Sequence, residues 1–550
     1  MWTDYRNVFS FEPGVYAQHA SGNAQPAAGW PAAGVAFVAS AAGQIVLSDG
    51  SGGVFLVTGG WDWYGHVLIR HVGPDGQTVA PWPANGVRIS ILSGPEPNSL
   101  RPAEPSEVEG AGPGDIMPSV ALDGAGGLLV SWTHVSRSAQ CVHVMKLSSA
   151  GTFDPSWPWS GAIVWPGYET QFQSCVTSDG QGGAFVAWDD EAGGVMVGHV
   201  LSNGTIDARW PVGGLSVSEP APASSAPGIV SDEQGGCFVT WQQSDGTGAS
   251  HPAIQHLLAD GGVAPGWAAH GSTLTTEPTE PGSFRTYQGY AFAYSSVTSD
   301  GSGGVLFAWA QGTPGGRHIY AQRIFSGGSS GSGSKRYEVA TSGGWGEDGV
   351  PVAASGSDDG LPTIVPDGSG GAFLAWQSVT ATGDNEIFAQ RVDAGGATAA
   401  GWPTEGFLIA SGPGTRQHPV VAADGSGGAL VAWEDSRDGV SSIFMGRANP
   451  AVAAVPIASP ANRLTLEGIR PNPSVAGPLR VEFSLPNSDR ATLELMDLAG
   501  RRVIEVEVGE LGAGAHVATL EAPRSLQAGV YWLSLRQDDG EVAKRCAVIR

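Results

Sequence analysis

The sequence predicts an all-β protein: a multi-bladed β-propeller followed by a small β-sandwich. Composition points to this first, because 83 glycines and 38 prolines stand beside only 14% charged residues, which is typical of short strands joined by tight turns. A turn-plus-strand unit then recurs along the first four fifths of the chain. Beyond residue 464 the repeat stops, and apolar and polar residues alternate as in half-buried strands.

The repeated unit is an Asp turn followed by an apolar strand that ends on tryptophan, as in Asp424-Gly-Ser-Gly-Gly-Ala-Leu-Val-Ala-Trp433. Aspartate can bond to its own backbone two residues on, and glycine accepts positive φ, so the turn suits a hairpin. The Asp-rich spacing of a calcium loop is absent, so we predict a structural role. The turns begin at Asp49, Asp123, Asp179, Asp232, Asp300, Asp367 and Asp424, and the strand-end tryptophans are Trp132, Trp188, Trp241, Trp309, Trp376 and Trp433.

Two further markers complete each repeat. One is a Trp-Pro-x-x-Gly corner, clearest at Trp30, Trp82, Trp210 and Trp402, with looser forms at Trp157, Trp267 and Trp345. The other is a strand such as Ile387–Val392, between the apolar strand and the corner. Each repeat therefore predicts four short strands. The second is apolar almost throughout, which indicates burial on both faces, and four-stranded units around an axis form a propeller.

The third strand carries a potentially cationic residue at one aligned position in every copy. We predict that this side chain bonds the turn aspartate or nearby carbonyl groups on the same face. The residues are His19, His71, Lys146, His199, His256, Arg323, Arg391 and Arg447.

The number of blades is open between seven and eight. Seven turns and seven corners, offset by one, predict seven blades, with the strand at Val35 completing the last sheet and removing two exposed edges. However, Trp2–Arg6 resembles Trp433–Arg437, which predicts that the chain begins inside a repeat and leaves eight blades as the alternative. We also expect a truncated N-terminus, since no signal peptide precedes this point.

Charge and cysteine content exclude several classes of function. A net charge of -25 argues against binding to nucleic acid, and no apolar run reaches the length of a membrane helix. Cys141, Cys175, Cys237 and Cys546 lack zinc-ligand spacing, so we predict no metal and no cofactor. They are expected as buried small residues, with a Cys141–Cys175 disulfide as the alternative. We expect a monomer.

No catalytic motif occurs in the sequence, so no catalytic residue is predicted. Candidate ligand-binding residues come from non-repeating loops on the face that bears the loops after strands two and four: Trp61, Trp63, Phe284, Tyr287, Tyr290 and Tyr294. We expect a binding or adhesion module for a glycan or a protein. The alternatives are a polysaccharide hydrolase or lyase and a passive structural protein. An enzyme should gather carboxylates, a Tyr or an Arg cluster at the channel mouth, whereas a binding module should show an exposed aromatic patch.

Residues 448–463 form an Ala/Pro-rich linker that separates the predicted propeller (1–447) from residues 464–550. The second segment contains Pro471-Asn-Pro473, Phe483-Ser-Leu-Pro486, Asp497-Leu-Ala-Gly-Arg501, Leu511–His516 and Ala528–Tyr531. In these blocks it resembles the C-terminal sorting domain of type IX secretion, a relative of the flagellar hook-capping Ig-like domain. The resemblance implies an Ig-like sandwich that the type IX machinery recognises, and a location at the bacterial outer-membrane surface or outside the cell. The hook-capping relatives lack that export role. The first part resembles repeat-rich bacterial surface propellers.

Overall fold

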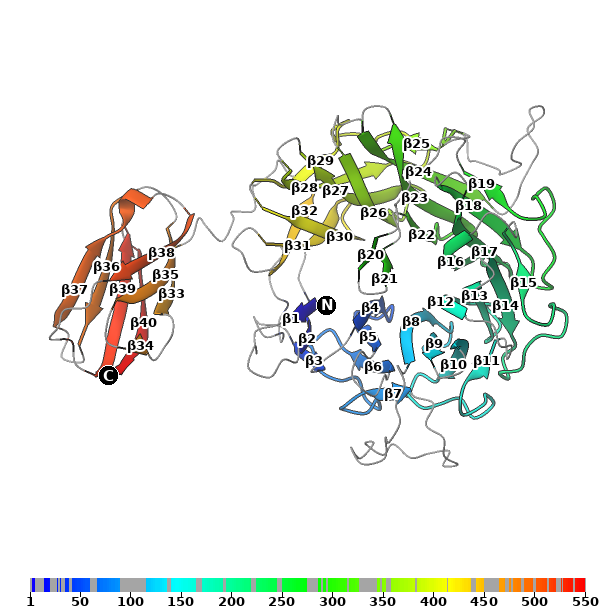
Figure 1. Cartoon of the computed structure of the whole chain (residues 1–550), viewed down its shortest axis with the longest axis horizontal. Helices are drawn as coiled ribbons and strands as arrows, with labels where there is room; N and C mark the ends of the chain where they lie inside the picture. The colour runs from blue at the N-terminus through cyan, green and yellow to red at the C-terminus, as the bar shows by residue number, and fades with distance from the viewer. Residues whose placement is uncertain are drawn as a thin grey trace. The chain divides into compact units, whose positions relative to one another are not determined.

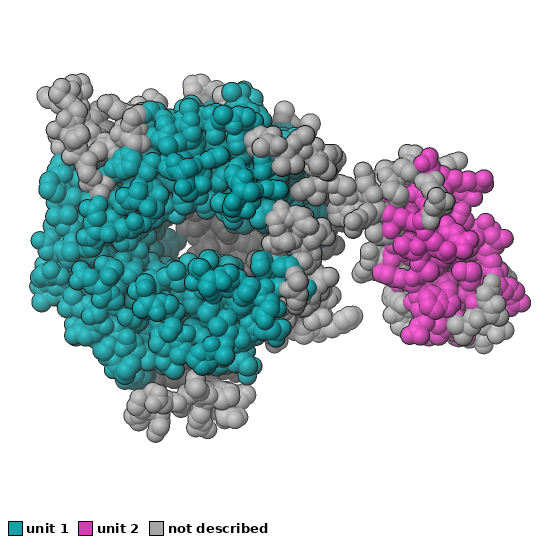
Figure 2. Space-filling model, turned by 180° about the vertical axis from the view of Figure 1, so that it is seen from behind, with its two compact units in different colours: residues 1–451 teal, residues 452–550 magenta. Residues whose placement is uncertain are grey.

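The computed structural model describes a nearly all-β chain. The described residues are 2–4, 14–19, 27, 30, 35–38, 42–59, 67–89, 115–135, 140–164, 171–190, 194–218, 224–244, 250–274, 285–287, 290–292, 295–313, 316–325, 344–346, 349–352, 358–380, 383–412, 414–436, 442–449, 464–469, 474–475, 478–485, 489–497, 501–511, 514–520, 526, 528–537 and 540–549. The chain divides into two compact units, Met1–Ala451 and Val452–Arg550 (Figure 2). Within the described residues, no helix is long and apolar enough to cross a membrane.

The first unit contains six antiparallel sheets of four strands each, in chain order. The first three are β4(Ala42–Ser48), β5(Val54–Gly59), β6(Val67–Val72), β7(Val87–Ile89); β8(Asp115–Leu122), β9(Leu128–Val135), β10(Gln140–Leu147), β11(Ala162–Ile163); and β12(Gln171–Ser178), β13(Ala184–Asp190), β14(Val195–Val200), β15(Leu215–Ser216). The next three are β16(Ser224–Ser231), β17(Cys237–Ser244), β18(Ser250–Leu257), β19(Ser272–Thr273); β22(Ser295–Ser299), β23(Gly304–Thr313), β24(Gly316–Phe325), β25(Val350–Pro351); and β26(Asp358–Pro366), β27(Ala372–Val379), β28(Asn385–Val392), β29(Phe407–Ala410).

Two three-stranded sheets stand at the ends of this series. They are β1(Trp2–Asp4), β2(Gly14–Ala17), β3(Val35–Val38) and β30(Arg416–Ala423), β31(Ala429–Asp435), β32(Ser442–Ala448). The prediction that the Val35 strand completes the last sheet is wrong, because Val35 pairs with Ala17 of β2. The described residues of the first unit therefore form eight sheets of three or four strands, and the eight-blade alternative holds.

The sheets follow one another around a ring, with the first strand of each complete sheet innermost (Figure 1). Apolar side chains fill the space between each consecutive pair of sheets, from the pair formed by β1–β3 and β4–β7 to the pair formed by β26–β29 and β30–β32. The strand-end tryptophans lie in these layers, with Trp132, Trp188 and Trp309 fully buried. Burial on both faces explains why the second strand is apolar throughout.

The second unit is a β-sandwich, which agrees with the prediction. Its two sheets have the strand orders β33(Thr465–Ile469)-β35(Leu479–Leu485)-β38(Gly514–Leu520) and β34(Ser474–Val475)-β40(Gly540–Ile549)-β39(Gly529–Gln537)-β36(Ala491–Met496)-β37(Arg502–Glu507), with a 3-10 turn η2(Gly509–Leu511). One core fills the space between the sheets, built from residues such as Val481, Phe483, Leu493 and Leu533. The inward-facing residues of the alternating strands supply it.

Candidate functional site

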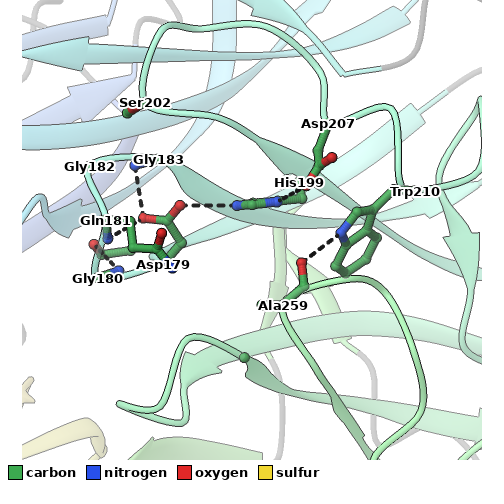
Figure 3. A network of polar contacts seen from close by, with 12 residues as sticks. Asp179, Gly180, Gln181, Gly182, Gly183, His199, Ser202, Asp207, Trp210 and Ala259 are labelled. Atoms are coloured by element: carbon green, nitrogen blue, oxygen red, sulfur yellow. Dashed lines mark hydrogen bonds and ion pairs between the residues drawn. The ribbon is translucent and has the colours of Figure 1, made fainter.

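The Asp turn is a hydrogen-bonded unit in which each atom of the carboxylate has a structural partner (Figure 3). Oδ1 of Asp179 accepts the backbone N–H of Gln181 at 2.7 Å and that of Gly183 at 2.8 Å. Oδ2 lies 3.0 Å from Nε2 of His199. Gly183 is required by close packing, since a Cβ there would lie 2.3 Å from the carbonyl oxygen of Val200.

The predicted contact between the turn aspartate and the third-strand cation is confirmed in all seven described turns. The shortest N–O distances are 2.9 Å for Asp49–His71, 3.7 Å for Asp123–Lys146, 3.0 Å for Asp179–His199, 2.9 Å for Asp232–His256, 2.8 Å for Asp300–Arg323, 2.7 Å for Asp367–Arg391 and 2.6 Å for Asp424–Arg447. His199 also lies 2.8 Å from Asp207. Burial acts to raise the pKa of Asp179, but hydrogen bonds from His199, Gln181 and Gly183 together hold it below its ordinary value. The turns are therefore structural.

The corner tryptophans also have a structural role, because their indole N–H groups bond the following sheet. Nε1 donates to a carbonyl oxygen in the turn after the next sheet's third strand. The pairs are Trp30–Pro74 at 2.8 Å, Trp82–Ser149 at 2.8 Å, Trp157–Ser202 at 2.9 Å, Trp210–Ala259 at 3.3 Å and Trp345–Ala394 at 3.1 Å. These indoles are unavailable for stacking on a ligand.

Most of the predicted ligand-binding residues lie outside the described residues: Trp61, Trp63, Phe284 and Tyr294. Tyr287 and Tyr290 pair with each other in a short hairpin, β20(Arg285–Tyr287) and β21(Tyr290–Phe292), whose side chains are also outside the description. In the view of Figure 1 the backbone of this hairpin lies within the ring.

A strained position recurs on the innermost strand of five sheets, six residues before the turn aspartate. A β-bulge interrupts the pairing there. The non-glycine residue within it has positive φ: 52° at Met117, 44° at Gln173, 56° at Ala226, 52° at Leu361 and 54° at His418. Such strain persists only where the surroundings enforce it, and it is common at functional sites. These residues line what we call the inner rim, and sequence reasoning missed them.

The last sheet places a histidine–carboxylate pair on the inner rim. Nδ1 of His418 lies 3.1 Å from Oε2 of Glu434, and Nε2 of Gln417 donates to the same oxygen at 3.3 Å. The side chains of His418 and Glu434 are 41% and 33% exposed, so both can reach a ligand in solvent. At the other four strained positions the residue is only half-exposed and carries no titratable side chain.

Asp189 is a second unusual carboxyl group near the inner rim. It is buried at the end of β13, and Oδ2 accepts the N–H of the strained residue Ala226 in the next sheet at 3.2 Å. Oδ1 is buried and has no partner among the described residues. Burial raises the pKa of Asp189 to about 7, against a smaller lowering by the Ala226 N–H.

The described part of the inner rim thus presents the His418–Glu434 pair in the last sheet and Asp189 beside Ala226. Among the described residues of the first unit, the exposed phenylalanine and tryptophan are Phe153 and Trp159, which lie between β10 and the outermost strand β11. No group of His, Cys, Asp and Glu side chains suited to a metal ion occurs within the described ranges. All four cysteines are free, so the alternative of a Cys141–Cys175 disulfide is wrong.

No family model and no curated protein matches the chain. Similar solved structures include an endo-arabinase from Bacteroides thetaiotaomicron (12% identity, TM-score 0.28, covering 60% of this chain and 93% of that one). Others are the polysaccharide lyase Uly1 (11%, 0.36, 76% and 91%) and a family PL25 ulvan lyase (9%, 0.38, 68% and 83%). At such low sequence identity and TM-score, the similarity carries no information about activity.

Proposed function

We propose that the propeller unit cleaves a polysaccharide at the inner rim, as a hydrolase or a lyase, with His418 and Glu434 as the acid–base pair. The observation that carries the proposal is the solvent-exposed contact of 3.1 Å between Nδ1 of His418 and Oε2 of Glu434 on strained backbone beside the ring opening. This reading replaces adhesion as the main hypothesis, because the described part of the rim presents titratable groups where a binding module should present aromatic ones.

Hydrolysis and elimination of a polysaccharide both depend on proton transfer. Hydrolysis and elimination each require a group that takes a proton and a group that returns one to the leaving oxygen, and histidine can do both near neutral pH. A carboxylate bonded to one ring nitrogen orients the other toward a ligand. Here the contact between Nδ1 and Glu434 fixes the His418 ring, and that ring is assigned the proton transfer.

The test is incubation of the full chain with a panel of neutral and uronate-containing polysaccharides. New reducing ends report cleavage by either reaction, and ultraviolet absorbance of an unsaturated product distinguishes elimination from hydrolysis. His418→Ala should lower kcat by about 10²- to 10⁴-fold. The control is His270→Ala, at an exposed histidine in the corner before β19, which should keep full activity. Cleavage that survives the loss of His418 would refute the assignment, and tight binding without turnover would restore the adhesion hypothesis.

We further propose that residues 464–550 direct export through the type IX machinery to the cell surface or the medium. Support comes from the five sequence blocks, among them Asp497–Arg501 and Ala528–Tyr531. The test is secretion of the full chain, fused to a secretory signal peptide, in a type IX-competent host, compared with the same fusion lacking residues 464–550. Unchanged export of the shortened chain would overturn this proposal.

A further inference from the structure

We infer that Arg416 is a positioning residue that fixes the geometry of His418 and Glu434 at the inner rim. The inference rests on the proposed function for its kinetic readout, but its structural readout is independent of any activity.

Arg416 connects three segments of backbone and a carboxylate while only 1% of its surface is exposed. Nη1 donates to the carbonyl oxygens of Gly412 at 2.7 Å, Asn385 at 3.2 Å and Gly414 at 3.4 Å. Nε lies 3.2 Å from Oδ2 of Asp435. One side chain therefore holds the segment before β30, the start of β28 in the previous sheet and the end of β31.

Arg416 and Asp435 flank the proposed acid–base pair in sequence and in space. Arg416 precedes His418 by two residues, Asp435 follows Glu434 directly, and Arg416 and Asp435 are paired across the two strands. Between them the backbone of His418 has positive φ and the pairing register shifts. A strained conformation of this kind is kept only when neighbouring contacts over-determine it. The buried ion pair supplies those contacts on one side of the bulge.

The repeat itself indicates that this ion pair serves more than the fold. The sequence position eight residues before the turn aspartate holds arginine in the last repeat alone; the other repeats have Ala41, Asp115, Gln171, Ser224, Phe292 and Asp359, of which Asp359 lies 3.7 Å from His318. In the β16–β19 sheet an uncharged pair connects the two strands at the equivalent position: Oγ of Ser224 donates to Oε1 of Gln243 at 2.9 Å. A buried ion pair is costly to desolvate and gives stability no better than a neutral pair. In the last sheet this ion pair joins Arg416 to Asp435 beside the bulge that carries His418, so we assign it a positioning role.

The experiment compares Arg416→Met, Arg416→Lys and the matched control Gln171→Met in the full chain. Gln171 is also fully buried, occupies the same repeat position and accepts the N–H of Val142 at 2.8 Å, but lies in another sheet. Hydrogen exchange of the segment 412–420 and the NMR signals of the His418 ring are measured first. Polysaccharide cleavage is measured second, as kcat and KM separately.

Arg416→Met should speed exchange of 412–420 and shift the His418 ring signals. It should also lower kcat by about 10²-fold with little change in KM, as expected when a catalytic group is misplaced by about 1 Å. Arg416→Lys, which keeps the charge and is the milder change if the methionine variant fails to fold, should give a smaller loss. Gln171→Met should leave both readouts unchanged. Exchange and ring signals at His418 equal to those of the control would overturn the inference, whether or not any polysaccharide is cleaved.

Discussion

At the scale of single residues, two environments move aspartate pKa values in opposite directions. In the turns, burial acts to raise the pKa of the aspartate, but side-chain and backbone hydrogen bonds favour the ionised form, so the pKa of Asp49 falls to about 2. At Asp189, burial meets a single N–H donor, and the pKa rises to about 7. The number of donors around each carboxyl decides the sign of the shift.

Replacing Asp189 with asparagine should remove a pH dependence of stability near neutrality. The folded pKa of about 7 lies above the unfolded value, so the folded state holds the proton more tightly. Stability should therefore fall as pH rises from about 4 to about 7, by up to about 4 kcal/mol. Denaturant unfolding at pH 5 and pH 8 measures the difference, which Asp189→Asn should abolish. The control is the neighbouring half-buried residue Asp190: the Asp190→Asn variant should keep the decrease of stability between pH 5 and pH 8.

Removing a turn carboxylate should leave donors without their acceptor. Asp179→Ala takes away the acceptor for Gln181, Gly183 and His199, of which His199 is buried. We expect a loss in the free energy of unfolding of about 1–3 kcal/mol for each buried donor left unsatisfied. The exposed Glu405→Ala should change it by less than about 0.5 kcal/mol. Equal effects of the two substitutions in urea titrations would contradict the structural role of the turn.

At the scale of elements, the sequence predicted the parts that local pattern encodes. The turn, the apolar strand, the corner and the third-strand cation each recur with a fixed composition, and pairing of the cation with the turn aspartate followed from their shared alignment. The bulge was not predicted, because the residues with positive φ are Met, Gln, Ala, Leu and His, and none is the glycine or asparagine that usually marks this conformation. The His418–Glu434 contact was missed for the same reason, since it depends on that bulge.

The corner tryptophans should contribute to stability through both ring and N–H. Trp157→Phe retains an aromatic ring but removes the bond from Nε1 to the carbonyl of Ser202, which should cost about 1 kcal/mol. Trp157→Ala should cost about 3–5 kcal/mol. Two residues away, Trp159 is 55% exposed, so Trp159→Ala should be nearly neutral. Thermal unfolding of the three variants measures this, and a destabilising Trp159→Ala would contradict the assignment of the two rings.

At the scale of the whole molecule, acid should affect the propeller through its turns. Six of the seven turn aspartates have lowered pKa values. A lowered folded pKa gives stability that is present above about pH 4 and lost as pH falls toward 2. Tryptophan fluorescence reports this unit, because of all the tryptophans only Trp532 lies beyond residue 463. We expect a cooperative change in emission below pH 4, and emission unchanged down to pH 2 would refute it.

The bonds from corner tryptophans to the following sheet give the propeller a polarity. Each of the five described bonds runs from one sheet to the next along the chain, so the sheets they join are linked donor to acceptor, like units in a head-to-tail polymer. A unit of that kind can be added or removed whole without changing the bonding rules of its neighbours. The number of sheets in the ring therefore equals the number of repeats in the chain, and duplication of one repeat can raise that number by one.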